Sequence, residues 1–127
     1  MLGNFQQTHL RIEVDAKATV IRDSLIRPTQ LRQWLWPQQL PVDLPEQFVS
    51  GLKFTGSIGP LSINYQVHRA DSDCLCLLLS QGIDGFHEWH WGDGWVQSRL
   101  EGISLIPLSL GQTLSLLSLR RFLQMQK

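Results

Sequence analysis

The residue types best suited to chemistry are concentrated in one ten-residue segment, 86–95. This segment holds three of the five tryptophans, two of the four histidines and two carboxylates of the chain. If it forms a strand, alternate side chains point to opposite faces. His87, Trp89 and Trp91 then share one face, and the second histidine shares the other face with an acid. The spacing therefore predicts an aromatic face and an acid–imidazole face on the same strand.

The acid–imidazole face carries Glu88 and His90, two residues apart in the sequence. A carboxylate beside an imidazole can move a proton near neutral pH, so this pair and His68 are the candidate catalytic residues. The alternative is a solvent-facing ion pair beside a core that the tryptophans fill, and the sequence favours that alternative. No catalytic residue is therefore assigned, and binding without catalysis is the favoured activity.

A metal or cofactor site is not indicated. His87 and His90 are three residues apart and point to opposite faces of a strand, whereas zinc needs three or four converging ligands. Cys74 and Cys76 lie in an apolar stretch, which is typical of small core residues in a reducing, cytoplasmic compartment. The sequence has no phosphate loop, nucleophile elbow or dinucleotide fingerprint. We therefore expect neither a metal nor a cofactor.

The composition narrows the class of protein. The chain has 127 residues, eleven Lys and Arg balance eleven Asp and Glu, and 43% of the residues are hydrophobic. This length fits one domain, 1–127, with a core of its own. Zero net charge argues against a nucleic-acid partner, and the apolar content argues against disorder. The uncharged stretch 102–119 is interrupted by Pro107 and Gly111, so we expect no transmembrane segment.

Hydrophobic periodicity predicts the order of the elements. Residues 9–15 alternate as a half-buried strand, and two short helices follow. A proline-rich loop spans 37–46. Six hairpin-linked strands come next, the first of them the short segment 47–50. The last element is a helix over 108–126.

The two short helices lie in the segment 18–35, whose pattern points to a known family. This segment resembles the opening of many members of the START and birch-pollen-allergen (SRPBCC) superfamily, with matches at Leu25, Pro28, Leu31 and Trp34. It is most similar to the branch related to the activator of the heat-shock chaperone ATPase and to short cyanobacterial members. The resemblance implies an α+β helix-grip fold of order β-α-α-β6-α. In this fold a curved antiparallel sheet wraps around a long C-terminal helix.

The fold implied by the resemblance leaves an apolar cavity between the sheet and the C-terminal helix. Aromatic side chains with few charges are typical of the wall of a ligand pocket, and an ordinary filled core is the alternative. The residues expected to line the cavity are Trp34, Phe54, Tyr65, Trp89 and Trp91, with Leu114 and Leu117 as its roof. The proline-rich loop would then be the gate.

The C-terminal helix carries two apolar stripes. One consists of Leu110, Leu114 and Leu117, and the other, on nearly the opposite side, of Leu108, Leu116, Leu119 and Leu123. A helix that is apolar on two sides is buried on two sides, so one stripe needs a further partner. A homodimer contact or a mobile lid over the cavity would provide it.

Three functions are compatible with these features. The first is a cytoplasmic protein that binds a small apolar or amphipathic molecule. The second is a cyclase- or hydrolase-like enzyme that uses Glu88 and His90 on the same scaffold. The third is a protein-interaction module similar to the co-chaperone relatives. The orientation of Glu88 and His90 separates the first two, because an enzyme needs both side chains in the cavity.

Overall fold

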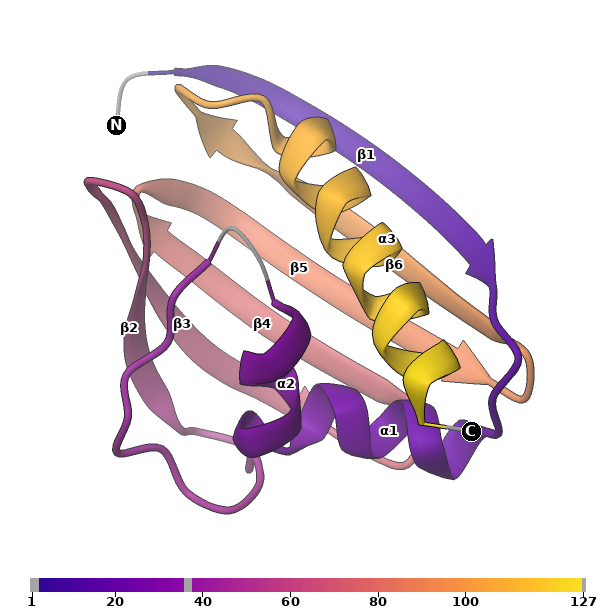
Figure 1. The fold of residues 1–127 in the computed structure, drawn as a ribbon. Helices are drawn as coiled ribbons and strands as arrows, with labels where there is room; N and C mark the ends of the chain where they lie inside the picture. Colours follow the sequence, from indigo (N-terminus) through magenta and orange to yellow (C-terminus); the bar gives the residue numbers. More distant parts are fainter. Residues whose placement is uncertain (1–2, 36–37, 127) are drawn as a thin grey trace.

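A curved antiparallel sheet and one long helix dominate the fold (Figure 1). The structure, a computed structural model, describes residues 3–35 and 38–126. Within these residues six strands pair in the order β1-β6-β5-β4-β3-β2. The strands are β1 (Asn4–Glu13), β2 (Lys53–Ile58), β3 (Leu61–Ala70), β4 (Cys74–Gln81), β5 (Ile83–Gly92) and β6 (Trp95–Ser104). The helices are α1 (Ala18–Ile26), α2 (Pro28–Trp34) and α3 (Leu108–Met125).

Strands β2 to β6 follow one another as antiparallel hairpins, and β1 pairs with β6 to complete the sheet. Along β3 the buried side chains are Ile63, Tyr65 and Val67, which matches the alternation in the sequence. Gly85 of β5 lies opposite Gly102 of β6. A Cβ at Gly85 would lie 1.9 Å from the Glu101 carbonyl oxygen, so only glycine permits these strands to approach so closely.

Helix α3 crosses the concave face of the sheet and contacts β1 and β6 (Figure 1). Gln6 of β1 holds the start of this helix, because its Oε1 accepts a hydrogen bond from the Leu108 N–H at 2.9 Å. The Gln6 amide also donates to the Ile106 carbonyl oxygen at 2.9 Å. A helix N-terminus has N–H groups without partners inside the helix, so this clamp stabilises α3 where it begins. In the part of the chain described, no helix combines the length and the apolar character that crossing a membrane requires.

Helices α1 and α2 lie at one end of the sheet and contact each other, and both contact α3. Ile21, Leu25 and Ile26 of α1 are fully buried. The backbone N–H of Ala18 donates to Asp93 Oδ1 at 2.8 Å, so a side chain from the β5–β6 turn caps the first turn of α1. This contact ties the turn of the tryptophan-rich hairpin to the helical end of the molecule.

The sequence prediction of a short strand at 47–50 is wrong, since this segment lies in the loop between α2 and β2. Phe48 is nevertheless buried, and its backbone N–H donates to the Ile26 carbonyl oxygen at 2.9 Å. The backbone therefore pairs with the end of α1 instead of with a strand. The remaining five strands of the predicted series, the N-terminal strand and the three helices are confirmed.

Candidate functional site

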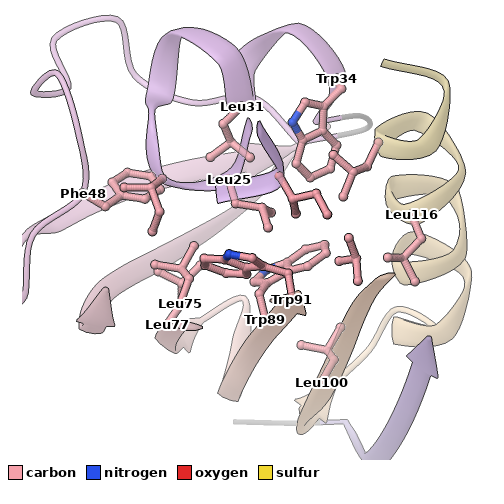
Figure 2. Packing of buried hydrophobic residues seen from close by; sticks show 14 of the residues in the cluster. Leu25, Leu31, Trp34, Phe48, Leu75, Leu77, Trp89, Trp91, Leu100 and Leu116 are labelled. Atoms are coloured by element: carbon pink, nitrogen blue, oxygen red, sulfur yellow. The ribbon is translucent and has the colours of Figure 1, made fainter. Parts of the chain in front are cut away.

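Two small adjacent cavities lie in the interior between the sheet and the helices. Their volumes are about 30 and 40 Å³, and Gln38, Tyr65, His87 and Ser115 line both of them. The first extends toward α1 and α2, where Leu25, Leu31, Phe48, Leu75, Leu77 and Trp89 form much of its apolar wall (Figure 2). The second extends toward the start of α3 and is bounded there by Ile106, Leu108 and Gly111. Four polar side chains therefore lie where the two cavities meet.

A larger hollow of about 490 Å³ lies over β2, β3 and β4 and is open at the surface. Polar side chains such as Lys53, Thr55 and Asn64 form much of its lining. An enclosed apolar space with a few converging polar groups is the better candidate for a binding site. The two interior cavities are therefore the candidate site.

The wall beside Tyr65 is a stack of three aromatic rings. Phe48 and Phe54 are parallel, with ring centroids 5.3 Å apart, and Phe54 and Tyr65 stack at 4.9 Å. The burial of Tyr65 raises the pKa of its hydroxyl above the ordinary value, so the group stays protonated. Among the described residues we find no hydrogen-bond partner for this hydroxyl. Tyr65 therefore offers an O–H donor on the boundary of both cavities.

His87 is the titratable group at the centre of the site. Burial lowers the pKa of its imidazole to about 3, so the ring is neutral near pH 7. The ring stacks on Trp89 with centroids 4.5 Å apart, and its Nε2 lies 2.6 Å from Ser98 Oγ. A neutral imidazole has one donor nitrogen and one acceptor nitrogen. The partner of Nε2 therefore decides which of the two ring nitrogens carries the proton.

Ser98 belongs to a buried chain of hydrogen bonds that reaches α3 and β1. The Gln112 amide nitrogen donates to the Ser98 carbonyl oxygen at 2.9 Å and lies 3.0 Å from Ser98 Oγ. Thr8 Oγ1 donates to Gln112 Oε1 at 2.7 Å. This chain joins β1, α3, β6 and β5 across the covered face of the sheet. It also satisfies the polar groups of Gln112 and Ser98, which are both buried.

The structure brings three of the predicted aromatic residues to the cavities, namely Phe54, Tyr65 and Trp89. Trp34 and Trp91 are instead packed in the core and line neither cavity (Figure 2). Trp34 meets Trp89 edge to face at 6.0 Å and donates from Nε1 to the Ser24 carbonyl oxygen at 2.8 Å. Trp34 therefore joins the helical end to the sheet, whereas Trp91 donates from Nε1 to the Ser72 carbonyl oxygen in the β3–β4 turn at 2.9 Å.

The prediction that Leu114 and Leu117 roof the cavity is wrong. Leu117 is 48% exposed and Leu114 is half-buried, and neither lines a cavity. Helix α3 turns its other stripe inward, so the residues over the sheet are Leu108, Gln112, Ser115, Leu116, Leu119, Phe122 and Leu123. Phe122 adds a large apolar side chain to that stripe, and the hydrogen-bond chain allows Gln112 to be buried within it.

The candidate catalytic residues do not reach the cavities. Glu88 and His90 lie on the outer face of β5, where His90 Nε2 is 3.7 Å from Glu88 Oε2. Arg99 of β6 lies 3.9 Å from the same carboxylate. His68 is an exposed residue of β3. Within residues 3–35 and 38–126, no cluster of three or more His, Cys, Asp or Glu side chains has the arrangement of a metal site.

The residues that sequence reasoning missed are His87, Ser98, Gln112, Ser115 and Gln38. The alternation predicted for segment 86–95 did place His87 and Trp89 on the same face of the strand. A histidine on an apolar face was the sequence signal that could have identified His87 as a site residue. Serine and glutamine carry no comparable signal, because their burial depends on partners from distant strands.

Among the described residues, the loop predicted as a gate is attached near its start and at its end, where Arg27 Nη1 lies 3.4 Å from Glu46 Oε1. Arg32 of α2 donates from Nη1 to the Pro41 carbonyl oxygen at 2.8 Å and to the Leu40 carbonyl oxygen at 3.4 Å. Gln39 and Ser57 exchange two backbone hydrogen bonds of 2.8 and 2.9 Å at the edge of β2. Pro37 lies outside the described residues. Hydrogen bonds near its start and an ion pair at its end therefore hold the loop over the cavities.

Solved structures match this arrangement, whereas no protein-family model and no curated protein sequence matches the chain. A protein of Chromobacterium violaceum matches with a TM-score of 0.72 at 15% identity, over 92% of this chain and 96% of that one. The Aha1 dimer from Colwellia psychrerythraea matches with a TM-score of 0.65 at 15% identity, over 93% of this chain and 96% of that one. Ginseng major latex-like protein 151 from Panax ginseng matches with a TM-score of 0.66 at 12% identity, over 98% of both chains.

The chain has the helix-grip fold. Both the fold class and the resemblance to birch-pollen-allergen-like and chaperone-activator-like proteins, expected from segment 18–35, are confirmed at the level of fold. A helix-grip fold does not determine a ligand or a reaction, so the activity must be argued from the cavities of this chain.

Proposed function

We propose that this helix-grip protein binds a small, largely apolar molecule between the sheet and α3, without catalysis. The observation that carries the proposal is the pair of mostly apolar interior cavities that meet at Tyr65 and His87. The outward position of Glu88 and His90 supports binding without catalysis, because the enzyme alternative needs both side chains in the cavity. The burial of apolar surface would drive binding, at about 25 cal/mol per Å².

A bound molecule requires a larger space than the two cavities provide. Each could hold about two or three water molecules, because a water needs roughly 10–15 Å³ of such volume. Drug-sized ligands occupy pockets of about 300–1,000 Å³. Gln38 and Leu40 of the loop after α2 line the cavities, so a displacement of this loop would enlarge the space. Binding therefore includes displacement of this loop.

Native mass spectrometry of the protein purified from its own host tests the proposal. We expect one small molecule per chain, released by denaturing extraction. Ser115→Phe places an aromatic ring at the cavities and should abolish retention of the molecule. Thr113→Phe, on the exposed side of the same helix, is the matched control and should retain it. A ligand-free mass for the wild-type protein would contradict the proposal.

A second candidate function is self-association through the outer stripe of α3. Leu110 and Leu117 are 58% and 48% exposed, and Met125 continues the same side of the helix. The fold neighbour from Colwellia psychrerythraea is a dimer, which supports a second copy of this chain as the occupant. Analytical ultracentrifugation of wild-type protein should detect a dimer that Leu110→Glu with Leu117→Glu dissociates. A monomer at all concentrations would exclude it.

A further inference from the structure

The hydrogen-bond chain beneath α3 has a fixed direction. The Ser98 carbonyl oxygen only accepts, so the Gln112 side chain must present its NH₂ group at that contact of 2.9 Å. The Gln112 carbonyl oxygen then faces Thr8 Oγ1, which donates to it at 2.7 Å. Turning the amide over would place two oxygens against each other at Ser98. The orientation of Gln112 therefore follows from its partners.

The same direction continues to His87. Ser98 Oγ accepts from the Gln112 amide at 3.0 Å, and its own proton is free to donate. His87 Nε2 lies 2.6 Å away, and among the described residues it is the acceptor that the Ser98 hydroxyl proton reaches. A neutral imidazole whose Nε2 accepts carries its proton on Nδ1. In the described part of the chain we find no partner for that Nδ1–H, and His87 lines both cavities.

Among the residues that the structure describes, no charged side chain lines the cavities. The residues that line the first cavity and those that line the second include no Asp, Glu, Lys or Arg. His87 is neutral because its burial lowers its pKa, and Tyr65 stays protonated because its burial raises its pKa. An ionised group in this space would lose its hydration without gaining an opposite charge, which is costly.

We propose that the site selects an uncharged molecule whose polar end is a hydrogen-bond acceptor, such as a carbonyl oxygen, held by Tyr65 O–H and His87 Nδ1–H. This inference rests on the proposed binding function and specifies its ligand class. The apolar remainder of the ligand would lie against Phe54 and Trp89. Carboxylates and ammonium ions are excluded because no group in the lining compensates a charge.

The tautomer of His87 is the first test, and it requires no ligand. Long-range ¹H–¹⁵N NMR of the imidazole nitrogens at pH 7 should show a protonated Nδ1 and an unprotonated Nε2. Ser98→Ala removes the donor to Nε2 and should produce a mixture of both tautomers. A protonated Nε2 in the wild-type protein would overturn the assignment of His87 as a donor to the cavity, whatever the protein binds.

A matched set of probes is the second test. Cyclohexanone, cyclohexanecarboxylate and methylcyclohexane share a six-membered ring and present an acceptor, a negative charge or neither. NMR titration should give a dissociation constant for cyclohexanone at least about tenfold below that of either other probe, since only the ketone gains two hydrogen bonds without bringing a charge into the site. Preference for the carboxylate, or equal binding of the ketone and the hydrocarbon, would overturn the ligand class and leave the binding function standing. Failure of all three to bind would overturn both.

Tyr65→Phe separates the hydrogen bond from the packing. The variant removes only the hydroxyl and keeps the ring that stacks on Phe54. We expect cyclohexanone to bind at least about threefold more weakly, since one of its two hydrogen bonds is lost, while methylcyclohexane binds as it does to the wild-type protein. The same loss for both probes would show that the hydroxyl acts through the structure of the cavity, and would overturn its role as a donor.

Discussion

Ser98 Oγ lies 2.6 Å from His87 Nε2, and this contact links two strands at the point where α3 covers them. Ser98 is completely buried, and Gln112 of α3 holds its other side. A buried polar chain of this kind stabilises the fold only while every member keeps its partner. The protonation of His87 would reverse this contact, because an imidazolium Nε2–H can only donate, and the Ser98 hydroxyl proton would then lose its acceptor.

Acid should therefore destabilise the protein through His87. The pKa of this imidazole is about 3 in the folded chain and about 6.5 in the unfolded chain. Between these values the unfolded state binds a proton that the folded state does not, so stability is lost as the pH falls below about 6.5. The contribution to the free energy of unfolding approaches about 1.4 kcal/mol per pH unit. Urea denaturation between pH 7 and pH 5 measures it.

His87→Gln should flatten this pH dependence, because glutamine does not titrate. His68→Gln is the matched control, since His68 is exposed on β3, and it should leave the dependence as in the wild-type protein. An unchanged dependence in the His87 variant would show that other groups cause the acid sensitivity.

Much of the fold could be predicted because its strands are half-buried and its helices follow clear breakers. Ile63, Tyr65 and Val67 alternate with polar residues and are buried as expected. The segment 47–50 could not be assigned correctly, because the partner of Phe48 is the end of α1 rather than a strand. That pairing depends on the path of a long loop, which local sequence does not specify.

The site was harder to predict than the fold. The alternation along β5 correctly placed His87 and Glu88 on opposite faces of the sheet. The leucines of α3 alone did not show which side of the helix faces the sheet. The buried stripe contains Gln112 and Ser115, which make it look less apolar than the exposed stripe. The burial of Gln112 is possible because Thr8, about 100 positions away, supplies a hydrogen-bond partner.

Two glycines with open space around them should respond oppositely to alanine. A Cβ at Gly111, inside α3, or at Gly51, in the loop before β2, would have no atom within 4 Å. Gly111→Ala should stabilise the protein by about 0.5–1 kcal/mol, because glycine costs a helix interior that much. Gly51 has φ +92°, so Gly51→Ala should destabilise by about 1–2 kcal/mol. Equal effects in urea denaturation would contradict this reasoning.

The attachment of the loop by Arg32 should control opening of the cavities. Arg32→Ala removes the donors to Pro41 and Leu40. The backbone pair of Gln39 and Ser57 should then open more often, and hydrogen exchange at both amides should accelerate about fivefold, as expected for a loss near 1 kcal/mol. Arg121→Ala, on the exposed side of α3, should leave these rates unchanged. If the exchange rates of both amides stay unchanged in the Arg32 variant, the start of the loop does not control the opening of the cavities.

Trp34 should contribute to stability through its indole N–H as well as its volume. In Trp34→Phe the buried Ser24 carbonyl oxygen loses the donor now 2.8 Å away, and the edge contact with Trp89 shrinks. We expect the free energy of unfolding to fall by about 1–3 kcal/mol, the usual cost of an unsatisfied buried acceptor.

Trp95→Phe is the control for the Trp34 variant. Trp95 is half-buried, and the Arg11 guanidinium lies 4.4 Å from its ring centroid, a contact that phenylalanine retains in part. The free energy of unfolding of this variant should fall by less than about 1 kcal/mol. Urea denaturation followed by far-ultraviolet circular dichroism compares the two variants without relying on tryptophan emission. If both lose the same stability, the ring volume alone accounts for the role of Trp34, and the hydrogen bond to Ser24 contributes nothing beyond it.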